Sequence, residues 1–527
     1  MKIKKIALIT SIIFSSNLAV AAISEVPSDL QSTTEFTSPL SEGADDFIEP
    51  EFSTSGQAGL IEGTYNNIFK LLKTGQLEEA AKQIQVFKTQ NPTEPDAYNL
   101  QALLKSIQKS YTSSIQDYQH ALKLDSKNLR ATLGLTAVYL QTEQLTKAKE
   151  YANASISIDD KAIAAYFFLA EIAAKQGRNQ DIESLLLTAQ GKTHGHIKYE
   201  LMTANKLSEF YVDHKQPEKS LKLAQDIAKR YPYHSSALAF LAKTQILNHQ
   251  TSNAISTLED LVSNDNNDSF HRLLLAGLLA KYPGNDQKIL QLMQEASVIS
   301  PNNSEIQIKK TVYLTRQKKL SAALDSAKTV RQLTPNSGKA ELLEGDIYLA
   351  EKKFDLALAA YQTSYNHSAN TYTLNLITQI LVAQKKPQSA INFLEQQYKN
   401  PPQSLKTENP NNVVVINNLA WLYHLQNDPR SVSLAAEAYK VAPQSAAVAD
   451  SYGVILVAHD SISKGIKVLK KASKLAPSNY DVSYHLANAY VLNGQHKQAI
   501  AILKPIVNSN QNFAEKAAAT SLLNKLK

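Results

Sequence analysis

The chain has 527 residues, enough for about three or four globular units with buried cores. It contains 16 glycines and 18 prolines, about 3% of each, which is below the usual share and argues against a turn-rich all-β protein. The absence of cysteine excludes disulfides, thiolate nucleophiles and cysteine-held zinc or iron–sulfur sites. An all-helical protein is therefore the leading expectation.

Residues 1–21 have the pattern of a secretory signal peptide. A basic start precedes an apolar stretch and the small-x-small motif Ala19, Val20 and Ala21. The pattern predicts cleavage after residue 21 and a periplasmic location, with an uncleaved N-terminal anchor as the alternative. No other segment has the ~20 apolar residues that a membrane span requires, so no stable membrane insertion is expected.

Residues 22–60 are predicted to be an acidic disordered linker. They carry eight carboxylates and no lysine or arginine, and they bury too little apolar surface to offset the entropy of ordering. The whole chain has a net charge of +7. Removing the three signal-peptide lysines and the eight linker carboxylates leaves +12 on residues 61–527. A basic body thus follows an acidic linker.

From residue 61 onward the sequence repeats with a period of 34 residues, which is the mark of a solenoid. Ten repeats occupy residues 61–402 and three occupy residues 413–512. The polar insertion 403–412, which contains Pro410, predicts an interruption of the stacking. The repeats start at Ile61, Pro95, Leu129, Ile163, Leu201, Ser235, Phe270, Ser304, Gly338, Thr371, Val413, Ala446 and Tyr480.

Two positions within the repeat carry small residues. Position 8 is small in twelve of the thirteen repeats, for example Ala102 and Gly453, and position 20 is small in most of them, for example Ser114 and Gly465. Two antiparallel helices approach closely only where both lack bulk. Proline is frequent at position 32, where it ends the second helix of a pair.

This pattern resembles the tetratricopeptide repeat, which is a helix-turn-helix unit with small residues at positions 8 and 20 and proline at position 32. The resemblance covers almost all of residues 61–512 and implies an all-α, right-handed superhelical solenoid of about thirteen units. Residues 513–527 are expected to form a capping helix that covers the last apolar face. Repeats four and seven depart from the pattern, with Ile182 and Ile289 at position 20.

The last three repeats carry a narrower resemblance. The stretch from Asn417 to Tyr423, with Asp450 to Gly453 and Tyr484 to Ala487, is similar to the C-terminal repeats of exported bacterial tetratricopeptide proteins. Some of those proteins belong to exopolysaccharide or exosortase-linked systems. Their lipoprotein cysteine is absent here, so their membrane anchoring is not implied.

Motifs for catalysis or cofactor binding are weak. Gly191, Lys192 and Thr193 lack the earlier glycine of a phosphate-binding loop, and His194 and His196 have no nearby carboxylate in the sequence. We therefore expect no catalytic residue, no metal and no cofactor, and a protein that is not an enzyme.

Binding residues are predicted from the resemblance, in which positions 2, 5, 9 and 12 of the first helix line the concave surface. Amides recur in these columns, and they can grip the backbone of an extended peptide. Trp421, the single tryptophan, is interpreted either as a groove anchor or as core filling beside the shortened eleventh repeat. The predicted partner site comprises Asn375, Gln379, Asn417, Trp421, His424, Asp450, Tyr484 and Asn488.

The expected partner is a protein or an extended peptide. Nucleic acid is not expected, because export argues against it and basic residues do not alternate with aromatic ones. The leading hypothesis is an exported scaffold within an envelope or exopolysaccharide-export assembly. The alternative is a subunit of an enzyme complex for polysaccharide synthesis or modification.

Overall fold

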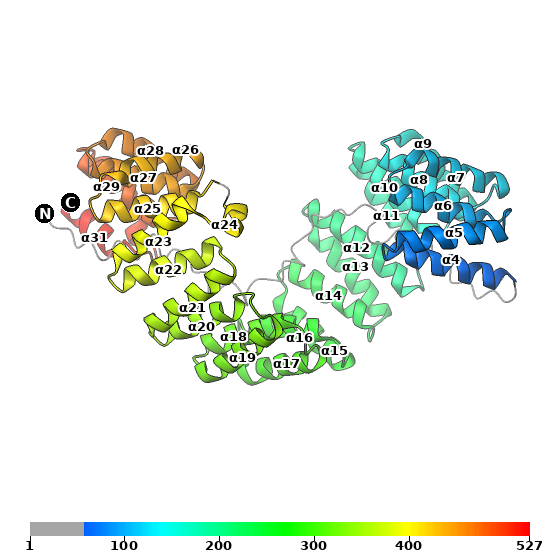
Figure 1. Ribbon diagram of the computed structural model, residues 1–527, viewed down its shortest axis with the longest axis horizontal. Coiled ribbons are helices and arrows are strands. Elements are labelled where there is room, and N and C mark those ends of the chain that lie inside the picture. The colour runs from blue at the N-terminus through cyan, green and yellow to red at the C-terminus, as the bar shows by residue number, and fades with distance from the viewer. Residues whose placement is uncertain (1–56, 410, 527) are drawn as a thin grey trace. The chain divides into compact units, whose positions relative to one another are not determined.

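The computed structural model describes residues 57–409 and 411–526, and these ranges contain 28 α-helices and no strand (Figure 1). The all-α prediction is confirmed. The predicted signal peptide and nearly all of the predicted linker lie outside the described residues. Within the described ranges, no helix combines the length and the apolarity that a membrane crossing needs.

The chain divides into two compact bodies, with the boundary between Leu279 and Ala280. We call residues 57–279 the N-terminal body and residues 280–526 the C-terminal body. The N-terminal body contains α4 (Gln57–Lys73), α5 (Leu77–Gln90), α6 (Pro95–Ile107), α7 (Tyr111–Leu124), α8 (Leu129–Gln141), α9 (Leu145–Ile158), α10 (Ile163–Lys175), α11 (Asn179–Lys192), α12 (Ile197–Asp213), α13 (Pro217–Arg230), α14 (Ser235–Leu247), α15 (Thr251–Asn264) and α16 (Ser269–Leu279).

The C-terminal body continues the same alternation of helices, with one short extra helix and a final single helix. It contains α17 (Asp286–Ile299), α18 (Ser304–Arg316), α19 (Leu320–Leu333), α20 (Lys339–Ala350), α21 (Phe354–His367), α22 (Thr371–Ala383), α23 (Pro387–Lys399), α24 (Gln403–Glu408), α25 (Val413–Leu425), α26 (Arg430–Val441), α27 (Ala446–Ala458), α28 (Ile462–Leu475), α29 (Tyr480–Leu492), α30 (His496–Asn508) and α31 (Lys516–Lys525).

The first helix of each repeat begins within one residue of the predicted start, except that α4 and α12 begin four residues earlier. The small residues at positions 8 and 20 meet within a repeat, as predicted. The hydroxyl oxygens of Ser208 and Ser220 lie 2.5 Å apart, and the Ser114 hydroxyl donates to the Ala102 carbonyl at 2.7 Å. Larger side chains at these positions would push the two helices apart.

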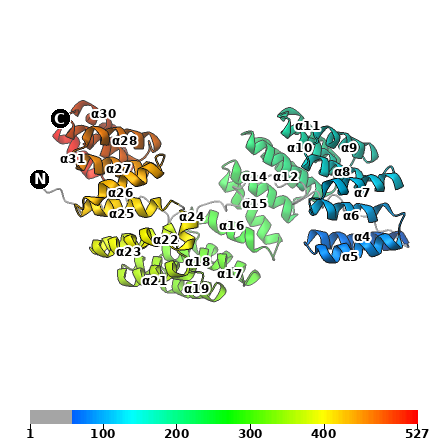
Figure 2. The same cartoon turned by 45° about the horizontal axis from the view of Figure 1, so that its top comes forward.

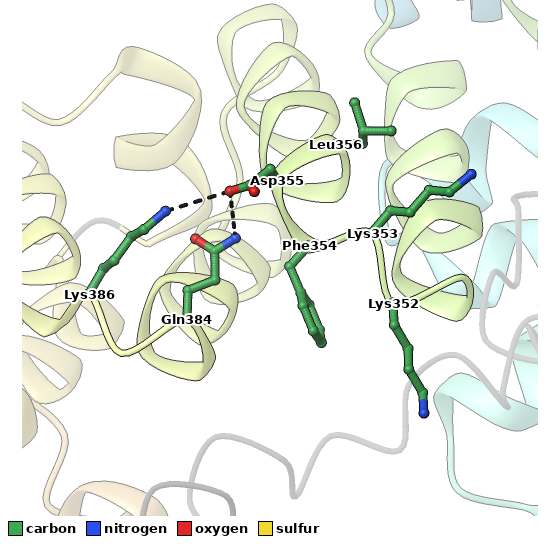
Figure 3. Close-up of a pocket in the computed structure, with 7 residues that line it drawn as sticks. All are labelled: Lys352, Lys353, Phe354, Asp355, Leu356, Gln384 and Lys386. Carbon is green, nitrogen blue, oxygen red and sulfur yellow. Dashed lines mark hydrogen bonds and ion pairs between the residues drawn. The ribbon is translucent and has the colours of Figure 1, made fainter.

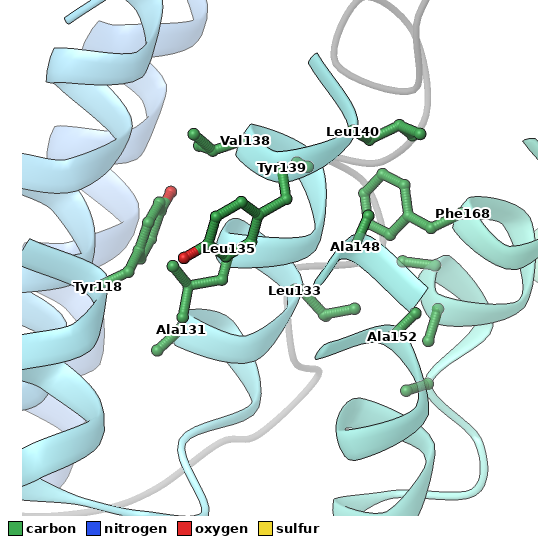
Figure 4. Packing of buried hydrophobic residues seen from close by; sticks show 14 of the residues in the cluster. Tyr118, Ala131, Leu133, Leu135, Val138, Tyr139, Leu140, Ala148, Ala152 and Phe168 are labelled. Carbon is green, nitrogen blue, oxygen red and sulfur yellow. The ribbon is translucent and has the colours of Figure 1, made fainter. Parts of the chain in front are cut away.

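The hydrophobic core runs between successive helices, so that each repeat shares its core with its neighbours. Figure 4 shows this for the second to fourth repeats, where Tyr118 of α7, Leu135 and Tyr139 of α8 and Phe168 of α10 belong to one buried cluster. A Cβ atom on Gly134 would lie 2.2 Å from the Tyr118 ring, so the glycine admits this ring. Stability is therefore distributed over nearest-neighbour contacts.

The turn between the two helices of each repeat contains a left-handed residue at position 15, a feature that the repeat pattern did not predict. This residue has a positive φ in all thirteen repeats, although only four of them place glycine there. This conformation lets the chain reverse its direction within a few residues, and glycine adopts it with the least strain. The residues are Gly75, Lys109, Glu143, Gly177, Lys215, His249, Gly284, Lys318, Lys352, Lys385, Asn427, Asp460 and Gly494.

The insertion 403–412 does not interrupt the packing at this point of the C-terminal body, contrary to expectation. It contains α24, whose Leu405 is fully buried in one cluster with Val415 and Leu419 of α25. The Ser404 hydroxyl also donates to the Ala369 carbonyl at 2.7 Å. A buried leucine and a hydrogen bond to the backbone therefore anchor an otherwise polar insertion.

The expected capping helix is present as α31, which follows α30 at the end of the C-terminal body (Figure 2). Its Ala519 and Leu523 are buried in one cluster with Leu486 of α29 and Leu503 of α30. The helix thus covers the apolar face of the last repeat, as an end cap must.

Candidate functional site

The first helices of the fifth, sixth and seventh repeats, α12, α14 and α16, enclose a hollow of about 700 Å³ in the N-terminal body. We call it the middle groove. Its lining comes mostly from positions 1, 2, 5 and 9 of these helices, with Phe240 at position 6 and several residues that come just before position 1. Three of the predicted concave positions, 2, 5 and 9, therefore border a hollow here. The main lining residues are Leu201, Met202, Asn205, Ser236, Ala239, Phe240, Lys243, Asp268, Phe270, His271 and Leu274.

The floor of the middle groove is apolar. Leu201, Phe240 and Leu274 are buried, whereas Phe270 at the rim remains 42% exposed. Met202 adds an unbranched side chain that adapts to the shape of a ligand. An apolar floor with a few polar groups at its margin is the usual composition of a ligand site.

The polar margin of the middle groove carries both signs of charge. His271 Nδ1 and Asp268 Oδ2 lie 2.5 Å apart, so this histidine is held by a carboxylate. The Asn205 amide donates to the Leu201 carbonyl at 2.9 Å, which fixes its orientation. Lys243 forms no ion pair with any described residue and offers a cation to a ligand.

The buried Arg272 holds the turn that carries part of this polar margin. It is 5% exposed, and its guanidinium donates to the carbonyls of Asp265 and Asp268 at 2.8 Å and of Val262 at 3.0 Å. These bonds hold the polar turn between α15 and α16, and with it the His271–Asp268 pair. The sequence pattern did not predict the buried arginine that orders this turn.

A second polar cluster lies on α4, α6 and α8 of the N-terminal body. The Arg130 guanidinium pairs with Asp96, lies 2.8 Å from Glu62 and stacks 4.1 Å from the centre of the Tyr65 ring. These charges stand at position 2 of three successive repeats. Two acidic residues followed by a basic one at position 2 were the sequence signal that could have predicted this cluster. Because the charges satisfy one another, this cluster offers less to a ligand than the middle groove.

The loop with His194 and His196 differs from expectation, because a carboxylate does lie nearby. His194 Nδ1 is 3.4 Å from Glu200 Oε1, and Glu200 is fully buried. Burial alone would raise the pKa of Glu200, but hydrogen bonds from Arg230 at 2.7 Å and from the Gly195 amide at 2.9 Å lower it. The carboxylate is thus committed to structural bonds. Among the described residues, no three histidine, aspartate or glutamate side chains gather as metal ligands would.

Three of the predicted partner-binding residues in the C-terminal body are buried: Asn417 is 7%, Trp421 2% and Asp450 4% exposed. Trp421 belongs to a cluster with Ala435 and Tyr452, so of the two interpretations of this residue the structure shows the core one. Its role as a groove anchor is wrong, because the neighbouring repeat closes over the indole.

Asp450 is committed to another buried group. Its carboxylate oxygens lie 2.9 and 3.0 Å from His485 Nδ1. Burial alone would lower the pKa of His485, but Asp450 raises it, with support from Glu515 and Asp481. The pair connects α27 with α29, and it replaces the contact that Asp450 was expected to offer to a partner.

The other predicted residues are partly exposed and their role stays a prediction. They come from three helices, and two of them have neighbours that bear on the site. The Asn375 side-chain oxygen accepts from Asn418 at 2.7 Å, and Tyr484 packs against the cluster that includes the cap. The partly exposed residues are Asn375, Gln379, His424, Tyr484 and Asn488.

Two family models described as tetratricopeptide repeat match the chain, over residues 95–128 and 456–526. The first match coincides with the repeat that begins at Pro95. No curated protein matches the chain.

The chain is also similar to several solved structures. For the APC/C hetero-tetramer Cut9–Hcn1 the identity is 14%, the similarity covers 90% of this chain and 96% of that chain, and the TM-score is 0.34. For yeast Tom70 the identity is 14%, with 83% and 96% covered and a TM-score of 0.40. For Naa15/Naa10 bound to HypK-THB it is 14%, with 88% and 70% covered and a TM-score of 0.32. No statement about function follows from these structural similarities.

Proposed function

We propose that this chain, a tetratricopeptide repeat protein, is a non-enzymatic scaffold that holds an extended segment of a protein partner in the middle groove. The repeat architecture itself supports a protein-interaction scaffold. The observation that carries the location is the hollow of about 700 Å³ between α12, α14 and α16, with its apolar floor and its unpaired Lys243.

The chemistry of the lining defines the segment that it would take. Apolar side chains of the ligand would cover Met202, Phe270 and the floor beneath them, which removes apolar area from water. An acidic group of the ligand would pair with Lys243, and the fixed amide of Asn205 would meet its backbone. The expected ligand is therefore a short extended peptide with apolar residues and at least one carboxylate.

We further propose that the scaffold works outside the cytoplasm, within an envelope or polysaccharide-export assembly. Residues 1–21 support export through their basic start, apolar stretch and small-x-small motif. The similarity of the last repeats to exported bacterial proteins supports the assembly. Export is tested by sequencing the N-terminus of the protein recovered from a periplasmic fraction, which should begin at residue 22.

Site-specific photo-crosslinking in native cells tests the proposed groove. A photoreactive residue at Ser236, which is exposed in the middle groove, should capture a partner that the same residue at Ser263 does not. Ser263 is the matched control because it is an exposed serine on α15 of the same body and does not line the groove. Capture of the same proteins at both positions, or of none at Ser236, would contradict the proposal.

A further inference from the structure

Three consecutive turns of the C-terminal body carry a basic surface that is separate from the middle groove. The helix-connecting turns of the eighth, ninth and tenth repeats each have lysine at positions 15 and 16, and all six lysines are exposed. No other repeat has lysine at both positions. We define the lysine ridge as Lys318, Lys319, Lys352, Lys353, Lys385 and Lys386.

The lysine ridge is limited to these three turns. At the same two positions the seventh repeat has Gly284 and Asn285, and the eleventh has Asn427 and Asp428. Asp428 in turn pairs with Arg430 at 2.7 Å. The positive charge is therefore concentrated over three successive repeats, so a ligand of the ridge has a defined length.

The local structure makes lysine a poor choice at both positions. Lys318, Lys352 and Lys385 have φ between 56° and 60°, a conformation that is unfavourable for a residue with a Cβ. The other three lysines stand at the N-caps of α19, α21 and α23 without a side-chain capping bond, and the positive end of a helix disfavours a cation. Repetition of two unfavourable choices in three consecutive turns indicates a function.

Most of the charge on the lysine ridge is uncompensated. Lys353 lies 3.0 Å from Glu351, and Lys386 lies 3.6 Å from Asp355. The other four lysines form no ion pair with any residue in the described ranges. The ridge therefore suits a ligand that carries several negative charges in a row.

The centre of the lysine ridge is hollowed and partly apolar. A depression of about 550 Å³ connects the turns of the ninth and tenth repeats (Figure 3). Two apolar side chains line it beside the charges, Phe354 with 39% and Leu356 with 49% of its surface exposed. The Gln384 amide donates to Asp355 at 2.9 Å, and this bond ties the turn of the tenth repeat to the start of α21. A ligand that fits here combines its charges with apolar groups.

The spacing of the turns favours one conformation of a linear ligand. First helices of neighbouring repeats, such as α18 and α20, pack against each other, and packed helices lie about 8–10 Å apart. Along a β-strand the side chains of one face recur every ~7 Å, which is shorter than this step. A polyproline II helix has about three residues per turn and rises about 3.1 Å per residue, so its same-face side chains recur every ~9 Å. Carboxylates at every third residue of such a segment match successive lysine pairs.

We propose that the lysine ridge binds an acidic, proline-rich segment of a partner protein in the polyproline II conformation. Its carboxylates pair with the lysines of the three turns, and its proline rings pack on Phe354 and Leu356, as proline-rich segments do on exposed aromatic side chains. The tetratricopeptide repeat architecture supports a protein as the ligand. The proposal does not depend on the function of the middle groove, because the two surfaces share no residue.

Fluorescence anisotropy with two synthetic peptides and the purified full chain tests the proposal. The ridge peptide consists of four Glu-Pro-Pro units, and the control peptide has the same composition with its glutamates in one block. At an ionic strength of about 0.15 M, charges are screened over ~8 Å, so lysines far from the bound peptide contribute little. The ridge peptide should bind at least about fivefold more tightly than the control peptide, because its carboxylates reach all three turns.

Two triple variants that each remove three lysines locate the binding site. The first combines Lys318→Gly, Lys352→Gly and Lys385→Gly, and it keeps the turns intact because four other repeats have glycine at position 15. The second is the matched control and changes three exposed lysines on other helices of the same body, in Lys467→Gln, Lys474→Gln and Lys504→Gln.

The glycine variant should bind the ridge peptide about tenfold more weakly, whereas the control variant should stay within about twofold of the wild type. Equal losses in the two variants would show that the peptide responds only to the overall charge, and this would overturn the proposal. Equal affinities of the wild type for the two peptides, or no binding of either one, would overturn it as well.

Discussion

The middle groove and the C-terminal repeats use the same columns of the first helix in opposite ways. In the middle groove, positions 2, 5 and 9 carry Met202, Asn205 and Lys243, and the surface between the helices stays open. In the eleventh repeat position 9 carries Trp421, and in the twelfth position 5 carries Asp450; both are buried. The same repeat position can therefore line an open groove in one repeat and be buried in another. The size of its side chain and the contacts that this side chain makes decide between the two.

The largest expected effect on stability comes from truncating the buried Trp421. Trp421→Ala should destabilise α25 and α27 by about 3–5 kcal/mol, because it removes a large buried side chain and leaves a cavity. Hydrogen exchange of the amides in these helices measures the loss locally, which suits an array that unfolds in parts. Phe270→Ala, at the open rim, is the control and should change local stability by less than about 1 kcal/mol. An unchanged exchange rate in Trp421→Ala would contradict the core role of Trp421 and support the groove interpretation.

The buried His485–Asp450 pair predicts a smaller, pH-dependent effect. Asp450→Asn should cost about 3 kcal/mol at pH 6, because it leaves a buried charge without its partner. The pKa of His485 is raised in the folded state, so the stabilisation is complete below the ordinary histidine pKa of about 6.5 and is lost as the pH rises through the folded value. The stability difference between wild type and variant should therefore shrink towards pH 9. A difference that does not change with pH would contradict the titration of His485 in this range.

Asp346 is the opposite case, because ionisation of its carboxyl group lowers the stability of the folded state. Burial raises its pKa to about 6, against a partial compensation by the Tyr361 hydroxyl, which donates to it at 2.6 Å. The folded state therefore loses stability as the pH rises from about 4 to about 6. Asp346→Asn keeps the acceptor for Tyr361 and should stabilise the ninth repeat by about 1–2 kcal/mol at pH 7. No gain should occur at pH 4; an equal gain at both pH values would assign the effect to packing.

The smallest effect concerns the left-handed turns, which occur in both bodies. Glu143→Gly should stabilise the third repeat by about 0.5–1 kcal/mol, because glycine adopts the positive φ of 58° without strain. Gly177→Ala, at the equivalent position of the next repeat, is the reciprocal variant and should destabilise by a similar amount. Thermal unfolding followed by circular dichroism checks both, and shifts of the same sign would contradict the explanation.

The sequence predicted the helices, their starts and the contact between positions 8 and 20, because these follow from a local pattern repeated thirteen times. It did not predict the left-handed turns, because position 15 carries residues such as lysine, glutamate and histidine in most repeats. Only a repeated glycine at this position would have indicated a positive φ. It also did not predict in which repeats positions 5 and 9 are exposed and in which they are buried. The burial of Asp450 depends on His485, which is 35 residues away in the next repeat, and no pattern within one repeat contains that information.

The most direct test compares the affinity of the captured partner for two double variants. The central claim is that the middle groove binds the partner, so Lys243→Ala with Phe270→Ala should weaken binding at least about tenfold, equivalent to about 1.4 kcal/mol. Tyr484→Ala with Asn488→Ala, which changes the predicted C-terminal site, should leave the affinity within about twofold. The opposite result, with binding lost only in the C-terminal pair, would contradict the account and locate the partner on α29.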